Sequence, residues 1–415
     1  MSPRLPALDA LPLPGPVWLL RLLLVLFLFV HLVFVDLMAG GAFMATVYAF
    51  KGKPKHWWVA GKLVRMLPYA TPIAVLFGVA SYLFTQVLYG PLFYSAAILV
   101  GAPFILIVPV LVAAYSLTVL TSWLWEELGK ARGYFTLGIF ALLSYAGFVY
   151  SNLFALVLEP ERFYAKYLAH PNGWQLDMAD FTVLPRFLHM AFAMVAMAGL
   201  WVAWGGMRRL RLEPEEGRWQ FRSGATWFAG ATLVNAVIGA WWFLAVPSEQ
   251  RMALAGGSLV GTVALMAGFA AAVAAVILVL NGINSIRPAR WVNAAFHSLL
   301  LCILAMVIVR DSLRGAYLEG AYSLGKLPVR TQGWALGLFL VVFAAGAGLA
   351  TWLVRLARRS RKRGPGDEEP IRGPGLTDTG LRRILPSESG FVRPPAETGP
   401  QRSQPSQTGP IRLDE

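Results

Sequence analysis

Cysteine and charged side chains are both scarce in this 415-residue sequence. It contains one cysteine, Cys302, and Asp, Glu, Lys and Arg together make up only 14% of the residues. One cysteine excludes an internal disulfide, a cysteine-ligated iron–sulfur cluster and a paired-cysteine motif for covalent heme attachment. So little charge excludes an ordinary soluble globular protein. Any cofactor is therefore held without covalent bonds, by histidine or methionine.

Long apolar runs take the place of the missing charge. Hydrophobic residues make up 57% of the chain, and the runs repeat at lengths of 20 residues or more. About 20 apolar residues in a helix cross a hydrocarbon core of about 30 Å. The sequence therefore predicts an all-α, polytopic membrane helical bundle of about nine transmembrane helices. The predicted spans cover residues 17–48, 66–88, 94–123, 134–158, 185–207, 225–246, 255–280, 291–309 and 334–356.

The distribution of Lys and Arg predicts the orientation of these spans. With the N-terminus outside, the short inner loops carry 14 Lys and Arg, whereas the outer segments carry nine. Positive charge collects on the inner side of short loops, so the prediction is N-terminus outside and C-terminus inside. The net charge of +14 follows from the same rule and requires no nucleic acid as a partner.

The two ends of the chain differ in composition from the predicted bundle, residues 17–356. Residues 1–16 are proline-rich and lack a signal-cleavage pattern, so we interpret them as a retained segment on the outer, periplasmic side. Residues 357–415 are basic and rich in proline and glycine. This composition predicts a disordered cytoplasmic tail.

The first apolar run holds a histidine near mid-depth. His31 follows Arg21 by ten residues, and Asp36 follows His31 by five. An ionisable side chain at such a depth is costly unless it has a partner. Two interpretations of His31 are open: a hydrogen bond to a neighbouring carbonyl, or ligation of a metal.

The order of several motifs resembles subunit I of the cytochrome bd quinol oxidases. The similar stretches are the first span, the run 76–103 and the segment Arg186-Phe187-Leu188-His189. The resemblance covers residues 17–205 well and the remainder poorly, and it implies a bacterial inner-membrane, multi-pass protein. It also implies two or more hemes b, with His31 and His189 as axial ligands. Arg186 would then be a partner of a heme propionate. In the first span the matching residues are Arg21, His31, Phe34, Val35, Gly40, Ala42 and Phe43.

Departures from that family's pattern count against oxygen reduction. Asp36 stands where the family has proline, and we take it as a candidate catalytic proton carrier or a buried neutral acid. The span 94–123 lacks the family's glutamates, so it offers no evident relay for the protons that oxygen reduction consumes. The family's long hydrophilic quinol-binding loop is also reduced here to a short link around residues 246–256.

Four further residues are weaker candidate ligands. Met252 lies near the position of a family methionine that ligates heme, although it is shifted by one residue, and Met266 is an alternative. His297 has no family counterpart and could ligate iron or form a hydrogen bond between helices. Met306, in the same predicted span, is a candidate ligand nearer the outer side, and Arg310 is a candidate propionate partner.

These features together predict an oxidoreductase subunit. In this prediction, the protein oxidises quinol and passes electrons to a c-type cytochrome or an iron–sulfur protein. Membrane lipid surrounds it, and a second membrane subunit is a further candidate partner. Asp36, Asp177 or Asp180 could accept the quinol protons. Two alternatives remain open: a terminal quinol oxidase that reduces O₂ to water, and a heme-free membrane anchor of a redox complex.

Overall fold

The computed structural model describes residues 12–169 and 171–360, and nearly all of their regular structure is helical. The exception is one isolated β-bridge between Leu13 and Val329. The α-helices are α1 (Val17–Lys51), α2 (Pro54–Val100), α3 (Ala102–Ile105), α4 (Ile107–Trp123), α5 (Arg132–Leu156), α6 (Phe163–Ala169), α7 (Val183–Arg209), α8 (Pro214–Ala245), α9 (Ser248–Met252), α10 (Leu259–Ile283), α11 (Pro288–Tyr317) and α12 (Gly333–Ser360).

Nine helical segments in the described part of the chain are long and apolar enough to cross a membrane. They confirm the predicted all-α bundle with nine spans. Helices are the expected form because lipid offers no partner to a backbone N–H or C=O, and a helix satisfies these groups within itself. The orientation of the termini stays a prediction.

One predicted boundary is wrong. The sequence predicts a break between residues 88 and 94, but α2 continues to Val100. The backbone instead bends at Tyr89, with φ −128° and ψ 26°, just before Gly90 and Pro91. Proline removes one helical hydrogen bond and commonly kinks a membrane helix without ending it. The chain reverses at Gly101, whose φ of 52° favours glycine.

The chain divides into two compact units, residues 1–339 and 340–415. The first unit contains α1 to α11 and the first residues of α12. That residues 17–356 form one bundle, as the sequence indicates, stays a prediction. The predicted disorder of the tail concerns mainly residues 361–415, and residues 1–11 belong to the predicted outer segment; both ranges lie outside the described residues.

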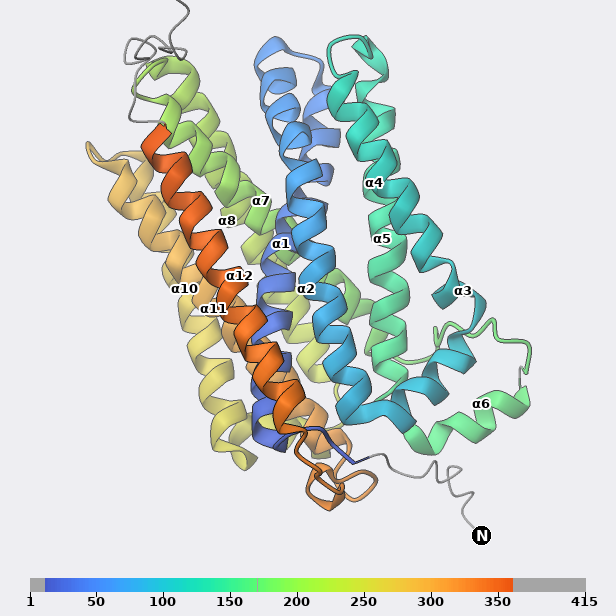
Figure 1. The fold of residues 1–415 in the computed structure, drawn as a ribbon. Coiled ribbons are helices and arrows are strands. Elements are labelled where there is room, and N and C mark those ends of the chain that lie inside the picture. The colour runs from blue at the N-terminus through green and yellow to red at the C-terminus, as the bar shows by residue number, and fades with distance from the viewer. Residues whose placement is uncertain (1–11, 170, 361–415) are drawn as a thin grey trace, which may run out of the picture. The chain divides into compact units, whose positions relative to one another are not determined.

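Within the first unit, α1 is the central helix and packs against α2, α5, α7 and α11 (Figure 1). The neighbouring pair α7 and α8 approaches very closely. A Cβ on Gly199 or on Gly224 would collide with the backbone of the opposite helix. Small residues at such contacts allow close helix packing in membranes. This packing fixes α7, which carries His189, against α8.

Candidate functional site

His31 faces the interior of the bundle. Its Nδ1 lies 2.8 Å from the carbonyl oxygen of Ala74 in α2. A carbonyl can only accept, so Nδ1 carries the proton and Nε2 keeps a free lone pair. The ring packs against Gly78, where a Cβ would lie 2.7 Å from Nδ1. Histidines that ligate a metal characteristically donate their other N–H to a carbonyl or carboxylate in this way.

His189 repeats this arrangement on another pair of helices. Its Nδ1 lies 3.3 Å from the carbonyl oxygen of Asn235 in α8. The ring lies over Gly239, where a Cβ would be 3.0 Å from Cε1. Trp242 is stacked on the imidazole, with ring centroids 6.5 Å apart. Each imidazole therefore rests on a glycine and donates Nδ1–H to a backbone carbonyl.

Two polar atoms beside His189 have no partner in the part of the chain that the structure describes. They are the side-chain oxygen Oδ1 of Asn235 and the indole Nε1 of Trp242, and both atoms are buried. A buried polar atom without a hydrogen bond costs about 1–3 kcal/mol. Such atoms need a hydrogen-bond partner, which a bound ligand or an ordered water molecule can supply.

The central helices are loosely packed around both histidines. Every residue in 29–35 of α1 and in 186–194 of α7 is partly exposed, although both helices lie inside the first unit. Since a helix turns once every 3.6 residues, such runs include every face. By contrast, residues 36–42 and 195–200 are all buried. The structure thus leaves space around His31 and His189 and closes it further along both helices.

The two histidines lie at similar depths. Gly40 of α1 packs directly on the backbone of Met194 in α7. As the first and fifth of nine spans, α1 and α7 run in the same direction, so this contact sets their register. His31 lies nine residues before Gly40 and His189 five before Met194, a difference of about 6 Å along the helix axis.

Two guanidinium groups, those of Arg186 and Arg310, lie near the two histidines. Arg186 is half-buried and has no ion-pair partner among the residues that the structure describes; its Nη2 donates to Thr182 Oγ1 at 3.1 Å. Arg310 of α11 has no hydrogen bond or ion pair within the described residues, and its Cζ lies 4.7 Å from the centroid of Phe154. Arg310 is repelled by Arg314 and Arg186, is attracted by Asp311, and acts electrostatically on His31. Two such cations without a carboxylate partner suit an anionic group between them.

An ion-pair network that sequence reasoning missed lies next to this site. Asp311 pairs with Arg21 at the start of α1 and with Arg314, whose Cζ is 4.9 Å from the ring centroid of Tyr89. The sequence signal was the run Arg310-Asp311 with Arg314 at the end of an apolar span. The network joins the first turns of α1 to the last turns of α11.

Asp36 is buried, with 6% of its surface exposed. Within residues 12–169 and 171–360 it has no hydrogen-bond or ion-pair partner. It lies where the loose packing of α1 ends, about one and a half turns from His31. An unpartnered carboxyl group at this boundary can take up or release a proton.

The acids of the loop before α7 have structural partners instead. Asp177 pairs with Lys166 at 2.7 Å and with Arg162 at 3.6 Å. The side chain of Asp180 accepts from the N–H of Thr182 at 2.8 Å at the start of α7. Glu159 pairs with Arg162, and this hydrogen bond raises the pKa of the Arg162 guanidinium. These contacts order the loop.

The remaining sequence-predicted residues lie apart from the two histidines. Met252 is 56% exposed at the end of α9, and Met266 is 64% exposed. Met306 packs on Gly268 of α10. His297 is exposed, and its Nδ1 bonds the carbonyl oxygen of Asn293 in its own helix at 2.7 Å. No described contact joins any of them to His31 or His189, so their ligand roles stay predictions.

The residues around His31 and His189 fit heme b. Each histidine leaves Nε2 free for iron, the surrounding helices are loosely packed, and Arg186 and Arg310 are suited to propionates. The unpaired Nε1 of Trp242 is a further donor. The carbonyl partners and glycine contacts could not be read from sequence, because they come from helices distant along the chain.

The fold resembles that of a solved bd oxidase structure. The structure of bd oxidase from Geobacillus thermodenitrificans superimposes with a TM-score of 0.64, covering 84% of this chain and 100% of that chain. Sequence identity is 14%, so the similarity shows a bd-like fold alone. No family profile matches the chain, and no curated protein matches it in sequence.

Proposed function

We propose that this protein is a membrane heme b subunit that oxidises quinol and passes electrons to a redox partner, a c-type cytochrome or an iron–sulfur protein. The observation that carries the proposal is the repeated histidine arrangement, in which His31 and His189 each donate Nδ1–H to a carbonyl and leave Nε2 free. The bd-like fold supports it. The redox centres would lie in the loosely packed part of the bundle.

Each residue near the histidines has a distinct role in this proposal. His31 and His189 would hold two hemes b, and Arg186 and Arg310 would bind propionates. Bound heme would supply one-electron steps between the two-electron donor quinol and a one-electron acceptor. Oxidation of quinol to quinone releases two electrons and two protons. Asp36 would accept a proton, because Asp177 and Asp180 are already engaged in the loop.

The test is the heme content and the reduced-minus-oxidised spectrum of the purified full-length protein. A b-type α band is expected, together with loss of one heme each in His31→Ala and in His189→Ala. His189→Ala is also expected to abolish reduction by quinol. An unchanged heme count in both variants would remove the assignment.

His297→Ala separates a ligand from an exposed histidine. Because His297 is exposed and bonds within its own helix, full heme content is expected in this variant. A loss of heme would instead support the sequence-based prediction that His297 is a ligand.

Two measurements distinguish the alternatives. Oxygen uptake driven by quinol in the isolated protein would indicate a terminal oxidase; the absence of acidic side chains from residues 102–123 argues against it. A purified protein without heme, which nevertheless assembles with redox subunits, would indicate an anchor.

A further inference from the structure

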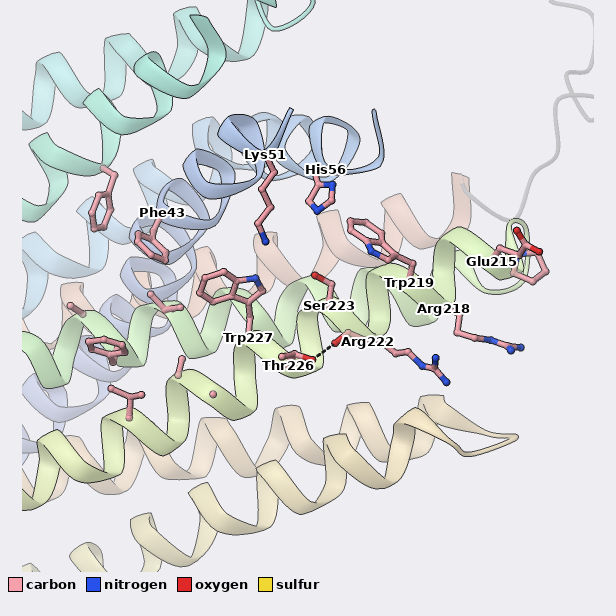
Figure 2. Close-up of a pocket in the computed structure, with 18 residues that line it drawn as sticks. Phe43, Lys51, His56, Glu215, Arg218, Trp219, Arg222, Ser223, Thr226 and Trp227 are labelled. Carbon is pink, nitrogen blue, oxygen red and sulfur yellow. Dashed lines mark hydrogen bonds between the residues drawn. The ribbon is translucent and has the colours of Figure 1, made fainter. Parts of the chain in front are cut away.

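A large groove lies along α8, and its apolar end comes within about one turn of His189, because Ala191 and Phe192 of α7 line it. Its volume is about 1320 Å³, and its walls come from α8 together with parts of α1, α2, α5 and α7 (Figure 2). Pockets for small ligands usually measure roughly 300–1,000 Å³. We call it the α8 groove. Neither His31 nor His189 lines it.

One face of α8 forms the length of the groove, and its chemistry changes steadily. Since side chains three and four residues apart share a helix face, the lining residues of α8 form a single stripe. The stripe begins with charge, continues with tryptophan and hydroxyl groups, and ends with small apolar residues. After Pro214, its members in order are Glu215, Arg218, Trp219, Arg222, Ser223, Thr226, Trp227, Gly230, Ala231 and Val234.

The charged end of the groove is basic. Arg218 and Arg222 are exposed, and neither has an ion-pair partner among the described residues. Lys51 reaches toward Trp227 from the end of α1, with Nζ 6.0 Å from a ring centroid (Figure 2). Glu215 is the one carboxylate in the lining. The lining at this end therefore carries three cations and one anion, and Arg218 and Arg222 extend away from Lys51 (Figure 2).

The apolar end is formed by aromatic and small side chains. Phe43, Phe140 and Phe192 come from three different helices, and Gly230 leaves open space, with no atom within 4 Å of a Cβ built on it. From Arg222 to Val234 the stripe extends about 18 Å along the axis of α8. One leaflet of a bilayer has a hydrocarbon thickness of about 15 Å, half of the core.

We propose that the α8 groove is a binding site for one anionic phospholipid, with its phosphate at Arg218 and Arg222 and an acyl chain along Gly230 toward Val234. The order of cations, tryptophans, hydroxyls and apolar residues matches the order of phosphate, glycerol and acyl chain. Basic pockets between transmembrane helices are suited to anionic head groups. Tryptophan at this depth is typical of the membrane interface. This site does not depend on the proposed heme chemistry.

The test measures lipid retained by full-length protein after delipidation and incubation with dioleoyl-phosphatidylglycerol or dioleoyl-phosphatidylcholine. Native mass spectrometry is expected to show one phosphatidylglycerol per chain and no retained phosphatidylcholine. The double variant Arg218→Gln/Arg222→Gln is expected to lower retention at least tenfold. Arg287→Gln is the matched control, because Arg287 is also an exposed arginine at the start of a span, outside the groove.

A second pair of variants tests the acyl-chain end without changing charge. Gly230→Trp fills open space in the groove, and we expect it to lower phosphatidylglycerol retention at least tenfold. Gly337→Trp is the control, because Gly337 also has no atom within 4 Å of an added Cβ but lies outside the groove. Equal retention of both lipids, unchanged retention in both groove variants, or a polypeptide or quinone in place of lipid would overturn the proposal.

Discussion

The imidazole of His31 in α1 packs on Gly78 of α2 so closely that a Cβ there would lie 2.7 Å from Nδ1. Glycine at this position is therefore what allows the ring to reach the carbonyl of Ala74. The orientation of a candidate ligand on one helix thus depends on the absence of a side chain on another. The same relation holds between His189 and Gly239.

Gly78→Val should displace the His31 ring and break its hydrogen bond to Ala74. We expect the variant to lose the heme assigned to His31 and to keep the heme assigned to His189, as measured by pyridine hemochrome assay. Gly90→Ala is the control on the same helix, because its Cβ would meet Tyr94 at an ordinary 3.6 Å. Full heme content in Gly78→Val would contradict the assignment.

Arg310→Gln should lower the midpoint potential of the heme near His31. The cation favours the reduced, less positive form, so its removal favours the oxidised form. For a separation on the order of 10 Å and an effective dielectric constant of 20, the change is about 1.7 kcal/mol, or roughly 70 mV for one electron. Redox titration measures it, with Arg287→Gln as control. A rise in potential would refute this role.

Asp36→Asn should slow quinol oxidation on the order of 100-fold while heme content stays unchanged, because an amide cannot accept the proton. Stopped-flow heme reduction measures the rate. Asp177→Asn offers a contrast: it breaks pairs with Lys166 and Arg162 and should destabilise the fold by about 1.5–3 kcal/mol. An Asp36→Asn variant with wild-type rates would exclude the proton role.

The ion pair between Arg21 and Asp311 should stabilise the contact of α1 with α11. Since 43% of the Arg21 side chain is exposed, we expect its loss in Arg21→Gln to cost no more than about 1 kcal/mol. A double-mutant cycle with Asp311→Asn, followed by thermal unfolding in detergent, measures the coupling. Additive effects of the two substitutions would show that the pair contributes nothing.

The predicted orientation can be tested with a membrane-impermeant maleimide on intact cells. In a Cys302→Ala background, Asn172→Cys should react, because residue 172 is exposed in a predicted outer loop. Lys53→Cys, exposed in a predicted inner loop, should react only after the cells are opened. The reverse pattern would place the N-terminus inside.

The fold was largely predictable because apolar length decides where a helix crosses a membrane. The nine spans follow from that signal. The error at residues 88–94 has a physical cause: Gly90 and Pro91 resemble a loop in sequence, but α2 tolerates them with a bend at Tyr89. Burial in a bundle can supply the contacts that a proline removes, and sequence does not show them.

The candidate site was predictable only in part. His31 was noted from its depth in an apolar run, whereas His189 and Arg186 were assigned through the resemblance to subunit I of the cytochrome bd quinol oxidases. Their contacts with Gly78, Gly239 and Asn235 depend on tertiary packing, as does the unpaired state of Arg310. The exposed positions of Met252 and His297 could likewise not be read from the sequence, because both lie in largely apolar surroundings.

The tight packing of α1 beyond Asp36 has an electrical consequence. Residues 37–42 of α1 and 195–200 of α7 are apolar and buried, so neither helix offers a polar side chain over this stretch. Electrons and protons exchanged around His31 and His189 would therefore enter and leave on the same side of this insulating layer. Turnover would then move little charge across the low-dielectric thickness of the membrane and would by itself generate almost no voltage.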